Sequence, residues 1–251
     1  MTRQAIAVAA GALLLGAAAL TASASAARQT KPSHSQTAGH MREHFTKVRE
    51  VEAAVIRGDL EAVHEPAQWL ASHESSLELD KASASQVSTM RQAAKRAAEA
   101  RDIPSAAAAT AAMLAACGDC HRAAGVVPKP ELPSPPAVGG TVGHMLEHQR
   151  AIDQMADGLI VPSAASWKRG AEALKAAPLR SSQFPRDPKL TREIVAAEDR
   201  VHVLAEQAAA AAEEPTRVNA YAQIISACAQ CHGLHGRIWG PGIAAPKLVS
   251  R

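Results

Sequence analysis

Aromatic side chains and cysteines are scarce in this sequence of 251 residues. It contains two phenylalanines, three tryptophans, one tyrosine and four cysteines, although 47% of its residues are hydrophobic and alanine is abundant. Small side chains let helices pack closely but fill little volume. This composition leaves room for another group in the core.

The sequence also lacks a large excess of charge. The formal net charge is +3 at pH 7. It falls to +2 if the N-terminal segment carrying Arg3 is removed. A nearly neutral chain does not favour nucleic acid or an anionic surface as a partner.

One apolar run stands at the N-terminus. Residues 5–20 carry no charge, follow Arg3 and precede the small-residue sequence Ala24-Ser25-Ala26. The pattern predicts a secretory signal peptide over residues 1–26, cut before Ala27. A retained anchor is the alternative, but the run is short for a span of about 20 residues. We expect an exported, periplasmic protein with no stable membrane span after cleavage.

Two short motifs each occur twice. GHMREH at 39–44 returns as GHMLEH at 143–148, and CGDCH at 117–121 returns as CAQCH at 228–232. The second copy is longer, and SSQFPRD at 181–187 is the natural place for its extra residues. Five prolines and three glycines in 125–140 indicate a stiff linker. The predicted organisation is a signal peptide (1–26), a first domain (27–124), a linker (125–140) and a second domain (141–251).

The apolar spacing within each copy is helical, and no alternating strand pattern is present. In the first helix Met41, Phe45, Val48, Val51 and Val55 recur at this spacing, and Gly58-Asp59 ends it. The predicted fold class is all-α, with two tandem up-and-down four-helix bundles. The predicted helices cover residues 38–57, 60–73, 84–101, 104–123, 142–160, 162–177, 189–213 and 215–233.

The two Cys-x-x-Cys-His segments use every cysteine in the chain. On a helix, cysteines three apart and a histidine one residue later share one face. Two such thiols can bond the vinyl groups of haem while the histidine reaches the iron, which is the attachment pattern of c-type haem. A redox dithiol, a zinc site and a plain disulfide are the alternatives. We expect thioether bonds from Cys117, Cys120, Cys228 and Cys231, and proximal iron ligands from His121 and His232.

A four-helix bundle that carries this motif near the end of its last helix resembles the cytochrome c′ family. In that family the first helix carries a methionine facing the distal side of the haem, and a glycine ends the helix about 17 residues later. Met41 precedes Gly58 by this step, and the same step from Met145 reaches Pro162. The resemblance implies two covalent haems in one chain. The family's bundles often form dimers, so the second copy would replace the dimer partner.

The ligand opposite each iron stays open between two side chains and an empty position. The resemblance favours Met41 and Met145, which core packing would also explain. His44 and His148 are the alternative distal ligands. Methionine opposite histidine raises the haem potential. An open position would let nitric oxide or carbon monoxide bind.

We expect an electron carrier that exchanges single electrons with unidentified donor and acceptor proteins, and not an enzyme. Binding or sensing of a diatomic gas is the main alternative. A dihaem peroxidase would need an open haem with acid–base groups above it. The repeated Glu43 and Glu147 are the only candidates for that role, and a solvated helix surface explains them better.

Overall fold

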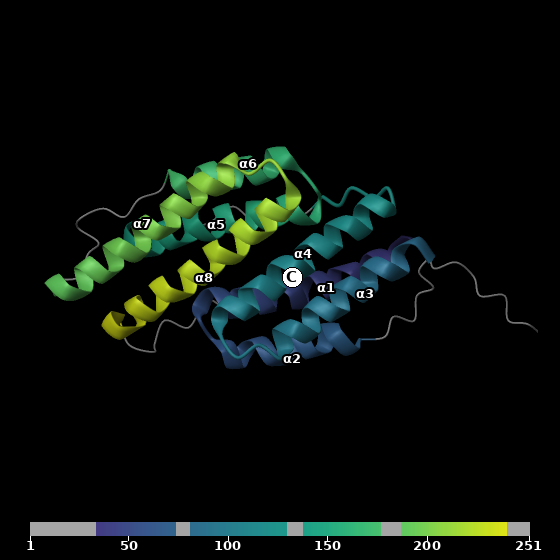
Figure 1. Cartoon of the computed structure of the whole chain (residues 1–251), viewed down its shortest axis with the longest axis horizontal. Coiled ribbons are helices and arrows are strands. Elements are labelled where there is room, and N and C mark those ends of the chain that lie inside the picture. Colours follow the sequence, from purple (N-terminus) through teal and green to yellow (C-terminus); the bar gives the residue numbers. More distant parts are fainter. Residues whose placement is uncertain (1–33, 74–80, 130–137, 177–186, 240–251) are drawn as a thin grey trace, which may run out of the picture. The chain divides into compact units, whose positions relative to one another are not determined.

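A computed structural model of the chain describes residues 34–73, 81–129, 138–176 and 187–239 (Figure 1). In these ranges the regular structure is entirely helical, so the predicted all-α class is confirmed. The signal peptide, half of the linker (130–137) and most of the expected insertion lie outside the described residues. The helices are α1 (His34–Arg57), α2 (Leu60–Ser72), α3 (Lys81–Ala98), α4 (Ile103–Ala123), α5 (Gly140–Ile160), α6 (Ala164–Lys175), α7 (Pro188–Ala210) and α8 (Glu214–Trp239).

The break between α1 and α2 follows from two adjacent residues. Gly58 has a φ of +73°, a conformation that ends helices and favours glycine. The next residue, Asp59, caps α2 by accepting a hydrogen bond from the Ala62 amide at 3.1 Å. The predicted helix end at Gly58-Asp59 is therefore confirmed.

The start of α4 also follows from its local sequence. The Asp102 side chain accepts from the Ser105 amide at 2.7 Å, and a proline occupies the first turn. In the second copy Pro162 was expected to open a helix. It instead precedes the cap Ser163, and α6 begins at Ala164.

Burial follows the sequence repeat. In the first helices Val48, Val51 and Val55 are buried, and so are the residues 104 positions later in α5. In the last helices Met113 and Leu114 are buried, as are the residues 111 positions later in α8. The offset between equivalent residues of the two copies changes from 104 to 111 between α6 and α7. The extra residues of the second copy were expected in this part of the sequence.

The helices of the two copies share one hydrophobic core. Neighbouring helices along the chain pack against each other within each copy, and α1 contacts α4 as α5 contacts α8. Helix α8 also packs against α4 and α1, and α4 packs against α5 (Figure 1). A single cluster of buried apolar side chains draws on all eight helices.

A charged network lies where the first helices of the two copies meet. Arg49 of α1 contacts Glu52 on its own helix and Asp153 of α5. Glu52 is 1% exposed and accepts a hydrogen bond from the buried Tyr221 hydroxyl of α8. Burial raises the pKa of the nearby Asp157 to about 6, with Glu52 adding to this rise and Arg49 opposing it.

Some expectations about single side chains were wrong. Phe45 was assigned to the apolar face of the first helix, but it is 37% exposed. Both identified tryptophans pack in the core: Trp167 is buried and donates to the Ala208 carbonyl at 2.7 Å, and the half-buried Trp69 packs against the same cluster. Five of the predicted helices also end at other residues: α2 finishes one residue early, α3 and α7 three residues early and α6 two residues early, and α8 continues to Trp239.

Helix α4 is long and apolar enough to cross a membrane by length and composition alone. From the sequence, no membrane span was expected after cleavage of the N-terminal segment. Half of the apolar window is buried inside the structure. Packing in a protein core therefore accounts for its composition as well as a membrane span would.

Candidate functional site

The first Cys-x-x-Cys-His segment occupies the last turns of α4. Cys117 and Cys120 are half-buried thiols that form no disulfide. His121 Nδ1 lies 2.9 Å from the carbonyl oxygen of Ile160, the last residue of α5. A carbonyl can only accept, so this contact places a proton on Nδ1 and leaves the lone pair on Nε2. That tautomer is the one in which a histidine ligates a metal through Nε2.

The second segment lies on α8 and is more deeply buried. Cys228 and Cys231 are free and buried, and His232 is half-buried. Cys231 packs against Ile194 and Ala197 of α7. Helix α7 therefore covers this segment.

The environment of the thiols disfavours a reactive dithiol. Burial raises the pKa of Cys117, Cys228 and Cys231 to about 12 in each case. The neighbouring thiol adds to the shift at Cys117 and Cys228. A redox dithiol instead needs a lowered pKa, because the thiolate is the nucleophile.

The first His-Met-x-Glu-His motif forms a cluster of imidazoles between α1 and α2. His40 and His44 lie one turn apart with ring centroids 4.3 Å apart. His73, which follows α2, lies 5.4 Å from both rings and stacks on Trp69 at 4.0 Å. A nitrogen from each of the three histidines lies within 4.8 Å of the others.

His44 holds a nitrogen with unmet bonding capacity. Its Nε2 is buried and has no hydrogen-bond partner. Burial, with the neighbouring His40 and His73 adding to its effect, lowers the pKa of His44 to about 4. The ring is therefore neutral at pH 7 and offers a lone pair or an N–H to a bound group.

The second His-Met-x-Glu-His motif gathers around a carboxylate. His144 and His148 of α5 are buried, with Nε2 atoms 3.1 and 3.9 Å from Glu198 Oε1 of α7. His202, one turn along α7, brings its Nε2 to 3.1 Å from the same oxygen. Burial acts to raise the pKa of Glu198, but the imidazoles of His144 and His202, each with Nε2 3.1 Å from Oε1, hold it well below its usual range.

Glu198 also connects this motif to the second cysteine pair. Its negative charge contributes to the raised pKa of Cys228 and of Cys231. The structure thus gathers parts of both repeated motifs of the second copy around one α7 side chain. Met41 and Met145, the favoured distal ligands, are half-buried on α1 and α5, each directly after a clustered histidine.

Each cysteine segment also packs against the first helix of the other copy. A Cβ atom added to Gly118 would lie 2.2 Å from the Leu159 carbonyl oxygen and 3.1 Å from Pro162 Cγ. In the second such contact, Gly58 faces Ala229 of α8. A Cβ atom added to Gly58 would lie 3.5 Å from the Ala229 carbonyl oxygen. Gly118 and Ala229 hold the same place in their motifs, and Pro162 and Gly58 hold the same place after the first helices. The two contacts are therefore equivalent.

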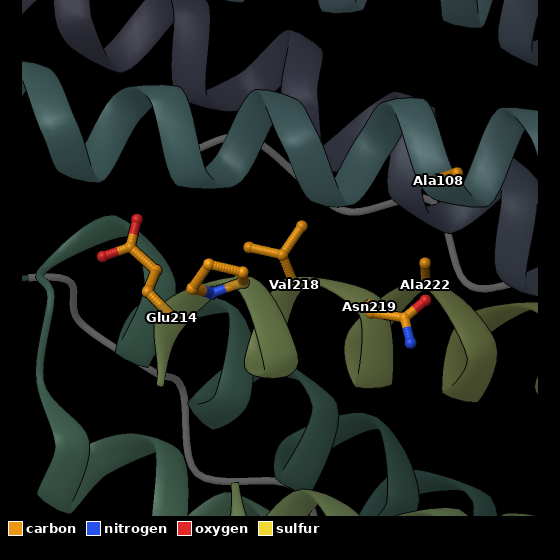
Figure 2. Close-up of a pocket in the computed structure, with 6 residues that line it drawn as sticks. Ala108, Glu214, Val218, Asn219 and Ala222 are labelled. Atoms are coloured by element: carbon orange, nitrogen blue, oxygen red, sulfur yellow. The ribbon is translucent and has the colours of Figure 1, made fainter. Parts of the chain in front are cut away.

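A shallow groove of about 360 Å³ lies along the contact between α4 and α8. Figure 2 shows Val218, Asn219 and Ala222 on α8 across from Ala108 on α4. Glu214, at its end, pairs at 2.9 Å with Arg122, the residue after the first proximal-ligand candidate. None of the four cysteines lines this groove.

Sequence reasoning missed three members of these clusters. His73, His202 and Glu198 were not among the candidate site residues. The repeat gave no signal for them, because α2 supplies the partner in the first copy and α7 in the second. The four-residue spacing of Glu198 and His202, which matches that of His144 and His148, is the signal that was available.

No family model matches the chain, and neither a curated protein nor a solved structure matches it.

Proposed function

We propose that the protein is an exported c-type cytochrome that carries two covalent haems on two tandem four-helix bundles and transfers single electrons. The observation that carries the proposal is the pair of Cys-x-x-Cys-His segments. They occupy corresponding turns of α4 and α8 and contain all four cysteines. This pattern is typical of c-type haem attachment.

The donor set of the first segment fits a haem. Cys117 and Cys120 are thiols outside any disulfide, one helical turn apart, and His121 follows them. The Ile160 carbonyl fixes the tautomer in which Nε2 is available. An outer hydrogen bond of this kind orients a ligating imidazole and raises its basicity.

The chain's own residues would set the properties of the group. Haem supplies reversible one-electron chemistry at iron when it is bound. His121 and His232 would hold the iron from the proximal side. The cysteines would fix the ring to α4 and α8, and the small-residue packing of the core would exclude water.

Two pairs of side chains are proposed for the distal side. Met41 and Met145 are favoured by the resemblance to cytochrome c′. The buried, unpartnered Nε2 of His44 supports the histidine alternative in the first copy. Either ligand gives six-coordinate iron, which suits an electron carrier. Binding of nitric oxide or carbon monoxide would require neither to ligate.

Haem stoichiometry is the direct test. The full chain is expressed with a haem-attachment system, and covalent haem is counted by mass and by absorbance under denaturing conditions. We expect two haems per chain. We expect one in the Cys117→Ala/Cys120→Ala variant and one in Cys228→Ala/Cys231→Ala.

Spectra of the same samples test the electron-transfer role. Low-spin spectra that carbon monoxide leaves unchanged, with reversible reduction of both haems, are expected. A near-infrared methionine–iron band that Met41→Ala weakens would assign that ligand. A high-spin spectrum that shifts with carbon monoxide would replace the carrier with a gas-binding protein, and absence of covalent haem would refute the proposal altogether.

A further inference from the structure

The cluster formed by His144, His148, Glu198 and His202 has the composition of a metal site, and it includes none of the cysteines and neither proximal-ligand candidate. Two helices each contribute a pair of side chains four residues apart, which places both members on one helix face. All three imidazoles direct Nε2 to one carboxylate oxygen. Glu198 and the two α5 histidines are buried.

The separations match those between ligands of one ion. Zinc lies about 2.0–2.1 Å from histidine nitrogen, so two ligands at a tetrahedral angle are about 3.3 Å apart. The three Nε2 atoms lie 3.1, 3.9 and 3.1 Å from Glu198 Oε1. The ligating atoms of His144, His148 and Glu198 all fall within 4.8 Å of one another.

The outer contacts also suit a metal ligand. His202 Nδ1 lies 2.9 Å from the Lys175 carbonyl at the end of α6. The carbonyl and the carboxylate both accept, so without a cation the ring must carry a proton on each nitrogen to bond both. With a metal ion, Nδ1–H keeps its carbonyl and Nε2 supplies a lone pair, which is the common arrangement around ligating histidines.

We propose that His144, His148, Glu198 and His202 bind one divalent transition-metal ion. Zinc is the ion of this class that best fits these ligands. Three imidazoles and one carboxylate are borderline ligands that suit zinc, and they bring one negative charge to offset the ion. The corresponding cluster at His40, His44 and His73 has no carboxylate among its three grouped residues. The histidine cluster of the second copy therefore includes a carboxylate, and the grouped residues of the first copy do not.

The inference stands independently of haem attachment. It assigns His148 to the metal ion, and it is compatible with Met145 opposite the second haem iron. Glu198 and His202 are not among the iron ligands proposed above. Variants at these two positions therefore test the metal site while haem content is read separately.

The test uses the mature full chain, treated with a chelator and then titrated with zinc chloride by calorimetry. Zinc retained after desalting is counted by elemental analysis. We expect Glu198→Gln and His202→Ala each to lose one zinc per chain, through a fall in affinity of more than about 100-fold. His64→Ala is the matched control, because it removes an imidazole bound to the Ala98 carbonyl outside both clusters.

Circular dichroism and haem content show whether each variant is folded. Thermal unfolding of the unaltered chain gives a second readout, since a ligand that binds only the folded state raises the Tm. A zinc-dependent rise in Tm that Glu198→Gln lacks supports the site. Equal zinc retention by the variants and the unaltered chain, or no zinc retention by the unaltered chain, overturns it. If the chain expressed with the haem-attachment system carries no covalent haem but binds zinc, the proposed function is refuted and this inference stands.

Discussion

Replacing Gly118 by alanine tests the contact between α4 and α5. The new Cβ atom would lie 2.2 Å from the Leu159 carbonyl oxygen, whereas real Cβ contacts essentially never fall below 3.0 Å. The obstacle is backbone, so the two helices must separate, and Pro162 Cγ at 3.1 Å hinders a sideways shift. Forcing an extra methyl group into a packed contact costs about 1–3 kcal/mol.

Gly233→Ala is the matched control for this prediction. Gly233 also lies in a helix beside a Cys-x-x-Cys-His segment, but a Cβ atom there meets nothing within 4 Å. Alanine is favoured over glycine in a helix interior by about 1 kcal/mol. We therefore expect Gly118→Ala to lower the free energy of unfolding and Gly233→Ala to raise it slightly.

Urea unfolding of the haem-loaded chain, followed by circular dichroism, measures both changes. For a protein of this size, 1 kcal/mol corresponds to about 2–4 °C in Tm, so thermal unfolding gives an independent value. Equal stability of the two variants would show that α4 and α5 do not approach at Gly118. The reasoning about contact between the copies would then fail.

Two further predictions concern the charged network between the copies. Arg49→Ala leaves the buried Glu52 without its cation and should lower the free energy of unfolding in urea by about 3 kcal/mol. Lys95→Ala, which removes one partner of an exposed pair, should lower it by about 0.5 kcal/mol or less. A comparable loss in both variants would contradict the network. Burial raises the pKa of Asp157 to about 6 from 3.8, so its protonated form stabilises the fold below pH 4 and this contribution disappears as the pH rises through 6. Asp157→Asn should therefore be more stable than the parent by about 1–3 kcal/mol at pH 8 and similar to it at pH 4, and a stability difference that is independent of pH would refute this pKa.

Local signals in the sequence predicted the helices well. Gly58-Asp59 and Pro104 act through backbone conformation and capping, which need only neighbouring residues. Helix ends without such signals were less accurate. Pro162 was misassigned because a proline suits either the first turn of a helix or the loop before its cap.

The clusters depended on tertiary contacts that sequence spacing does not contain. The pairs His40/His44 and His144/His148 were visible because four residues make one helical turn. Their partners His73 and Glu198 come from non-equivalent helices, so a search for repeated residues passes over them. Phe45 was misplaced because helical spacing identifies an apolar face without showing how far along the helix its neighbours extend.

The pairing of Arg49 with Asp153 has a consequence for how such a chain can evolve. The two residues occupy the same position in the two copies, 104 residues apart, and they contact each other. In a dimer of identical subunits, residues that meet their own counterpart have the same charge and repel. Joining two copies in one gene removes this symmetry requirement, since each half can then mutate alone. A pair of two first copies would place arginine against arginine at this contact, and a pair of two second copies would place aspartate against aspartate. Neither copy can therefore replace the other in this ion pair.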